Sequence, residues 1–277
     1  MLIKIGFEII YASPQTTPMV LMLSVHPSRC SDLLGSDTIA TTPDLPMTTY
    51  LDGYGNLCTR LVAPPGQLRL SAEALIRDSG LPDAIAPDAR EFPVQQIPSD
   101  VLLYLLGSRY CETDHLVNIA WGFFGNTEPG WSRVQAIVDY VHNHVEFGYH
   151  YARPTKSAFE VYQERRGVCR DFAHLAIALC RCMNIPARYA TGYLGDIGVP
   201  KDPAPMDFSA WFEVWLDGEW YTFDARHNIP RIGRVLMAHG RDAADVALTT
   251  SFGQTYLTQF VVCTEDVNTA EMVEQAA

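Results

Sequence analysis

One segment constrains the fold of this chain more than any other feature: CRDFAHLAIALCRCM, residues 169–183. Its only charged residues are Arg170, Asp171 and Arg181. Apolar side chains therefore surround the predicted helix on nearly every side, which is typical of a helix buried between layers. Gly167 permits a sharp turn into the helix. The sequence thus predicts a central buried helix whose first residue, Cys169, lies at the floor of a cleft.

The rest of the chain divides into a strand-rich part and a part that begins with helices. Residues 1–90 contain short alternating or β-branched runs separated by Pro, Gly and Asp, a pattern that predicts a β-sandwich. Residues 91–100 end a proline-rich stretch without periodicity and are interpreted as a linker. Helical patterns and then strands follow over 101–265, the predicted second domain, and 266–277 is interpreted as an acidic tail. The fold class expected from this order is α+β.

The composition limits which classes of partner the protein is expected to bind. A net charge of −12 argues against electrostatic binding to nucleic acid or to an anionic membrane surface. The sequence has no run of about 18 apolar residues that predicts a membrane span. The seven cysteines have no repeated spacing and the first residues alternate like a strand, so we expect reduced thiols and a cytoplasmic location. His142 and His144 fall on different faces of a helix, so no metal site is expected, and no motif calls for a cofactor.

Cys169 is the candidate nucleophile. Free backbone N–H groups and the helix dipole favour an anion at the start of a helix, and here that anion would be the thiolate. Three arginines nearby add positive potential: Arg165, Arg166 and Arg170. The alternative is that Cys169 is a small buried hydrophobic residue, as Cys180 and Cys182 are expected to be. Local reasoning leaves both readings open.

Two blocks, GVCRDFAHLAIALCRCMNIPARYATGYL and DFSAWFEVWLDGEWYTFDARHN, resemble the transglutaminase-like superfamily, and within it the bacterial transglutaminase-like cysteine proteases. The resemblance covers roughly residues 130–262, and YLDGYGNLCTRLVAPPGQLRLSA is similar to the β-sandwich that precedes this domain in bacterial members. It implies a papain-like core of helices packed on an antiparallel sheet, and acyl transfer through a cysteine. Cys169 matches the family's nucleophile and Asp224 its orienting carboxylate, whereas Ser209 stands where the family has a histidine.

The hairpin signal Asp217-Gly218 supports this alignment. It pairs residue 216 with residue 219, and positions 209 and 224 then share one face of the sheet. A histidine at 209 could bridge the gap to Asp224, but a serine is too short and is not a base at neutral pH.

The missing histidine raises the question of a substitute base. His227 follows Asp224 and would point to the opposite face in a regular strand, so it qualifies only if the chain bends there. His174 lies on the helix of Cys169 but is rotated away from the thiol and is expected in the core. His150 precedes the cleft in sequence, and nothing fixes its direction.

Gln163 and Trp211 are the remaining candidates for the site. Gln163 lies six residues before Cys169, the spacing at which papain-like enzymes place an oxyanion donor, and the Cys169 backbone N–H is a further candidate. Trp211 is expected to wall the cleft or to pack in the core. Two functions stay open: a cysteine hydrolase or acyltransferase of protease or amidase type acting on a peptide or protein, and a catalytically impaired pseudoenzyme whose cleft binds a peptide or partner protein. The sequence leaves the substrate and the oligomeric state undetermined.

Overall fold

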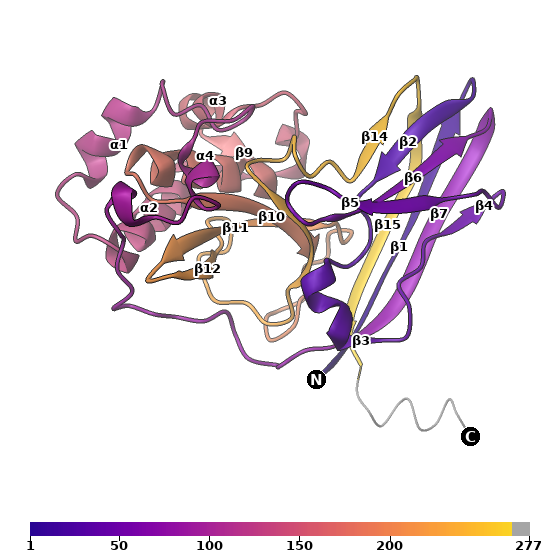
Figure 1. Cartoon of the computed structure of the whole chain (residues 1–277), viewed down its shortest axis with the longest axis horizontal. Coiled ribbons are helices and arrows are strands. Elements are labelled where there is room, and N and C mark those ends of the chain that lie inside the picture. Colours follow the sequence, from indigo (N-terminus) through magenta and orange to yellow (C-terminus); the bar gives the residue numbers. More distant parts are fainter. Residues whose placement is uncertain (268–277) are drawn as a thin grey trace.

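The computed structural model describes residues 1–267. The chain before residue 78 forms a group of strands and one 3-10 helix, and two late strands join them (Figure 1). These elements are β1 (Leu2–Ser13), β2 (Thr17–Leu21), a 3-10 helix (Pro27–Asp32), β3 (Leu33–Leu34), β4 (Ala40–Thr42), β5 (Thr48–Leu51), β6 (Leu57–Ala63), β7 (Gly66–Arg77), β14 (Thr249–Ser251) and β15 (Tyr256–Asp266). The part of the predicted acidic tail from 268 onward lies outside the described residues.

The N-terminal β-sandwich has two antiparallel sheets. One runs in the order β15-β1-β7-β3, with β4 also pairing with β7, and the other in the order β14-β2-β6-β5. Apolar residues alternate along β1, so that Ile3, Ile5, Phe7 and Ile9 all face the interior. That period of two is the physical reason this segment forms a strand with one buried face.

The expected boundary at residue 265 needs correction, because β15 belongs to the sandwich and not to the second unit. β15 pairs with β1 over nearly its whole length, from Ile3 opposite Asp266 to Ala12 opposite Tyr256. The buried residues Val262 and Thr264 of β15 lie opposite buried residues of β1. The sandwich is therefore made from both ends of the described chain.

The second unit contains the predicted helices and an antiparallel sheet. Its elements are α1 (Val117–Phe124), α2 (Trp131–His144), β8 (Glu146–Phe147), a 3-10 helix (Tyr149–Tyr151), α3 (Ala158–Glu164), β9 (Arg166–Gly167), α4 (Cys169–Cys182), β10 (Ala187–Tyr193), β11 (Ser209–Leu216), β12 (Glu219–Phe223) and β13 (Val235–Gly240). The sheet runs β12-β11-β10-β13, and 3-10 turns at Val94–Gln96 and Leu102–Leu105 precede it in the chain. Figure 1 shows the helices on one side of this sheet and the sandwich on the other side of the molecule.

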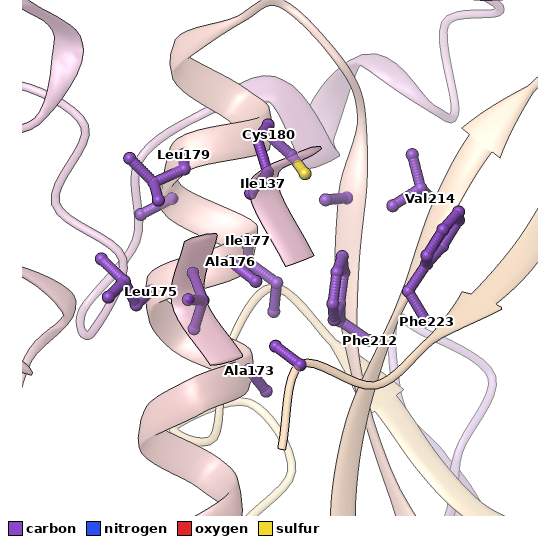
Figure 2. Packing of buried hydrophobic residues seen from close by; sticks show 14 of the residues in the cluster. Ile137, Ala173, Leu175, Ala176, Ile177, Leu179, Cys180, Phe212, Val214 and Phe223 are labelled. Carbon is purple, nitrogen blue, oxygen red and sulfur yellow. The ribbon is translucent and has the colours of Figure 1, made fainter. Parts of the chain in front are cut away.

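α4 is the central buried helix that its sequence predicts. Every residue from Asp171 to Cys182 is buried. Side chains of α4 pack against Ile137 of α2, Phe212 and Val214 of β11 and Phe223 of β12 (Figure 2). Shortening one of its fully buried leucines to alanine is expected to cost about 2–5 kcal/mol of stability. The helix is thereby a rigid support for Cys169.

The segment between the two units contains one short 3-10 helix, Val94–Gln96, and otherwise neither helix nor strand, but it is not a free linker. Asp83 bonds to Arg234, and Glu91 accepts a hydrogen bond of 2.6 Å from Arg133. The backbone of Arg90 is hydrogen-bonded to Asp217 in both directions. These contacts fasten the segment along the second unit. Across residues 1–267, no helix has the length and apolarity that crossing a bilayer requires.

Candidate active site

Cys169 is the first residue of α4, and its position is fixed by Asp171. The buried carboxylate of Asp171 accepts the backbone N–H of Val168 at 3.1 Å and pairs with Arg170 at 2.9 Å. A Cβ at Gly167 would lie 2.6 Å from the Cβ of Asp171, so only glycine fits there. The carboxylate of Asp171 thus occupies the anion position at the start of the helix, a position that the sequence analysis assigned to the thiolate.

The surroundings of Cys169 shift the pKa of its thiol in the direction opposite to the predicted one. Burial raises the pKa of Cys169 to about 11, and the carboxylate of Asp207 acts in the same direction. Arg226 and the backbone N–H groups of Ala210 and Arg170 favour the thiolate but do not outweigh burial. This environment favours the thiol and so does not support the predicted thiolate. At neutral pH the group is a thiol and needs a base to act as a nucleophile.

An open cavity of about 520 Å³ lies beside Cys169. Its lining includes the aromatic side chains of Tyr110, Tyr149, Tyr189 and Phe208 from the second unit. A volume in the range of about 300–1,000 Å³ is usual for ligand sites. The cysteine is therefore placed where a substrate could reach it.

Ser209 begins β11 and lines a second, smaller hollow of about 80 Å³. Tyr149 and Asp207 line both hollows, so the two adjoin. The expected hairpin is confirmed, with Leu216 opposite Glu219. Ser209 itself is 8% exposed, and its carbonyl accepts the hydroxyl of Thr191 at 2.9 Å.

His227 lies in this second hollow and is bound to Asp224. The Asp224 carboxylate accepts the backbone N–H groups of Arg226 and His227 at 3.0 and 3.1 Å, which turns the chain directly after β12. The turn brings the His227 ring back, and its Nδ1 lies 2.8 Å from Oδ2 of Asp224. The bend on which a substitute base depends is thus present, and the regular-strand direction does not apply.

Asp224 is held as an anion. Its burial would raise its pKa, but Arg234 and the hydrogen bonds from His227 together lower the pKa below its ordinary value. Arg234 Nη2 lies 3.0 Å from the same Oδ2 that receives His227. An ionised carboxylate only accepts hydrogen bonds, so Nδ1 of His227 carries the proton of this bond, and Nε2 is the ring nitrogen that Asp224 does not bind.

The other candidates lie elsewhere. Gln163 is exposed on α3 and lines neither hollow, so the structure does not bring it to Cys169. Trp211 is buried under Arg234, whose guanidinium carbon lies 5.0 Å from the ring centre, and it lines a different hollow. His174 is fully buried, where its Nε2 accepts the backbone N–H of Ala243 at 3.1 Å, and His150 is exposed.

Three residues of the site escaped sequence reasoning: Tyr149, Asp207 and Arg226. Tyr149 and Asp207 line both hollows, and the charge of Arg226 acts on the thiol of Cys169. Arg226 stacks on Phe147, with its guanidinium carbon 3.8 Å from the ring centre. Only their positions in the sequence could have indicated two of these residues. Asp207 lies two residues before Ser209, and Arg226 lies two residues after Asp224.

The same fold occurs in known proteins. A sequence profile described as the transglutaminase-like superfamily matches residues 118–225, a range that contains both Cys169 and Asp224. The chain is similar to the crystal structure of a "Putative Cysteine Protease" from Cytophaga hutchinsonii. The two are 33% identical with a TM-score of 0.83, and the match covers 97% of this chain and 91% of that one.

Two mycobacterial proteins are also similar in sequence. The uncharacterized protein Rv2569c of Mycobacterium tuberculosis is 26% identical over 234 residues, which cover 72% of this chain and 69% of that protein. The uncharacterized protein ML0607 of Mycobacterium leprae is 35% identical over 98 residues, so that the match spans 33% of each chain.

Proposed function

The chain belongs to the transglutaminase-like superfamily, and from that premise we propose that it is a cysteine hydrolase or acyltransferase acting on a peptide or protein. In this proposal Cys169 is the nucleophile, and His227 replaces the family histidine as the general base. The observation that carries the proposal is the 2.8 Å hydrogen bond between His227 Nδ1 and Asp224 Oδ2, in a hollow that adjoins the one at Cys169.

The proposed reaction follows the usual course of covalent catalysis. Nε2 of His227 takes the proton of the Cys169 thiol as the sulfur bonds to the substrate carbonyl carbon, and the carbonyl electron pair moves to oxygen. When that oxygen re-forms the carbonyl, the bond to the leaving amine breaks, and His227 returns the proton to the amine. Water or an amine then attacks the thioester and releases the acyl group from Cys169.

The small side chain of Ser209 supports this assignment. Ser209 and His227 line the same hollow of about 80 Å³, so an imidazole at 209 and one at 227 would compete for one space beside Asp224. A serine there leaves the Asp224 carboxylate to His227.

The pseudoenzyme reading has its own supporting observation. Burial raises the pKa of Cys169 to about 11, which disfavours the thiolate at neutral pH, and Ser209 supplies no base beside it. If His227 does not accept the thiol proton, the cavity binds a peptide or partner protein without turnover.

The experiment compares four full-length proteins: wild type, His227→Ala, Ser209→His and Cys169→Ala. Each is mixed with an N-acetylglycine thioester at pH 7, and acylation is followed by intact-protein mass spectrometry. We expect acylation of the wild type at Cys169, a loss of about 10²–10⁴-fold in His227→Ala, and no gain in Ser209→His. His150→Ala is the matched control, since His150 is an exposed histidine outside both hollows.

Two results would overturn the proposal. One is an acylation rate that is equal in wild type and His227→Ala. The other is an inert wild type that gains tenfold or more from Ser209→His, which would establish the pseudoenzyme.

A further inference from the structure

The cavity beside Cys169 has one wall from each unit. The second unit contributes the cysteine and a group of tyrosines, and the sandwich contributes Ile9 and Tyr11 of β1 with Leu257 and Phe260 of β15. Since these strands carry the two ends of the described chain, the sandwich is part of the site that the cysteine faces.

A β-bulge directs Leu257 into this wall. Ile9 lies opposite Phe260 and Ile10 opposite Gln259, but Tyr11 then lies opposite Leu257, so that Thr258 is the extra residue. Without the bulge, Leu257 would point to the outer face of the sheet with Gln259. Bulges are frequent next to active sites, where they re-aim a side chain.

Leu257 is left half exposed by residues 1–267. Its exposed fraction is 54%, although it stands on the same face as the buried Ile9. A large apolar side chain that is half exposed at the rim of a cavity gains stability when a ligand covers it.

The two arginines that line the cavity do not favour an anionic occupant, and Asp207 is the other charged residue in its lining. Arg170 is paired with Asp171, and Arg153 with Glu160 and Glu164. What remains for contact between Cys169 and the sandwich is largely aromatic and aliphatic.

We propose that Tyr11, Leu257 and Phe260 form one wall of an apolar subsite that takes a bulky aromatic or aliphatic side chain of the peptide whose carbonyl meets Cys169. The position of the carbonyl rests on the proposed function, whereas the apolar subsite itself does not. Leu257 is in these terms a specificity-determining residue supplied by the sandwich.

The test uses two thioesters with one leaving group, N-acetylphenylalanine and N-acetylglycine, and two full-length variants. Leu257→Ala removes the wall, and Val261→Ala is the matched control. Val261 lies on the same strand with an exposed fraction of 49%, but it lines a hollow on the other face of the sheet. We expect the wild type to prefer phenylalanine over glycine in kcat/KM by tenfold or more. Leu257→Ala should reduce that ratio about tenfold, and Val261→Ala should leave it within twofold.

A binding measurement separates this inference from the proposed function. Three proteins are titrated with N-acetylphenylalaninamide by calorimetry: Cys169→Ala alone, Cys169→Ala with Leu257→Ala, and Cys169→Ala with Val261→Ala. Binding that weakens about tenfold with Leu257→Ala supports the subsite even if the wild type turns over neither thioester, in which case the proposed function alone fails. The inference is overturned if Leu257→Ala matches Val261→Ala in both the kcat/KM ratio and the binding, or if Cys169→Ala binds no aromatic ligand.

Discussion

Arg234 holds Asp224 while it is itself held by Asp83. Its Nη2 lies 3.0 Å from Asp224 Oδ2, and its Nε lies 3.0 and 2.9 Å from the two oxygens of Asp83. The segment that joins the two units thereby reaches, through one buried arginine, the carboxylate that orients His227. Arg234 is therefore the residue whose loss would break both of these ion pairs.

Replacing Arg234 by methionine should destabilise the protein strongly. The change leaves two carboxylates without their cation, one of them buried, and such a loss costs about 3–5 kcal/mol in free energy of unfolding. Urea denaturation at pH 7 measures it. Arg60→Met is the control, since Arg60 is exposed and its side chain only contacts Thr48 at 3.4 Å, and its effect should stay within about 0.5 kcal/mol. Equal midpoints for the two variants would contradict the prediction.

Alkylation of Cys169 should be slow at neutral pH and should accelerate with pH. Because burial raises the pKa of Cys169 to about 11, the thiolate fraction grows about tenfold for each pH unit between 7 and 10. Iodoacetamide labelling followed by peptide mass spectrometry measures the rate at each pH. The exposed Cys30 should react faster than Cys169 at pH 7. A Cys169 rate that levels off below pH 9 would show that its pKa is lower than the structure indicates.

Acid should weaken the contact between the sandwich and the second unit. His26 and His239 stack with ring centres 4.8 Å apart, and burial followed by the charge of Arg188 lowers both pKa values, that of His239 to about 3. A histidine whose pKa falls on folding contributes stability that is complete above its unfolded pKa of about 6.5. That stability is lost as the pH falls from 6.5 toward 3.

Urea denaturation between pH 7 and pH 4.5 measures this loss of stability at pH values above those at which Asp224 titrates. Because the pKa of His239 falls to about 3, this residue should cost about 1.4 kcal/mol of stability per pH unit below 6.5 in that window. His239→Gln should flatten the profile, whereas the exposed His150→Gln should leave the slope unchanged. The prediction would be contradicted if the free energy of unfolding of the wild type did not change between pH 6.5 and pH 4.5.

Trypsin should cut after Lys201 before it cuts after Arg90. Lys201 is exposed in a stretch without helix or strand, whereas the backbone of Arg90 bonds to Asp217 through both its N–H and its carbonyl. Trypsin cuts a segment only after the backbone hydrogen bonds of that segment have broken, so the segment around Arg90 is protected. Timed digestion with mass spectrometry gives the order, and Lys201→Gln should delay the first cut. A first cut after Arg90 would mean that the joining segment is loose.

Short-range patterns predicted the central helix and the hairpin for clear physical reasons. Nearly continuous apolar character is visible in α4 itself, and Asp217 and Gly218 both adopt the positive φ angles, 47° and 92°, that a tight hairpin turn requires. The partner of β15 was beyond such reasoning, since alternation shows that a strand has a buried face but not which sheet receives it.

The direction of the His227 side chain illustrates the same limit. Asp224 is a turn-forming residue, and its side-chain bonds to the next backbone N–H groups are the signal that could have reversed the expected direction of His227. The pKa of Cys169 was not accessible from sequence, because it depends on how many atoms pack around the sulfur in the folded state.

The pairing of β1 with β15 also sets an order of events during synthesis on the ribosome. β1 is synthesised before α4 and the sheet of the second unit, whereas its neighbour β15 is synthesised after them. Until then one edge of β1 has unpaired N–H and C=O groups, which are prone to pair with another nascent chain. β15 then completes the pairing of β1 and, through Leu257, the wall facing Cys169. A ribosome-bound chain that stops before residue 256 therefore presents a cysteine without its complete cavity.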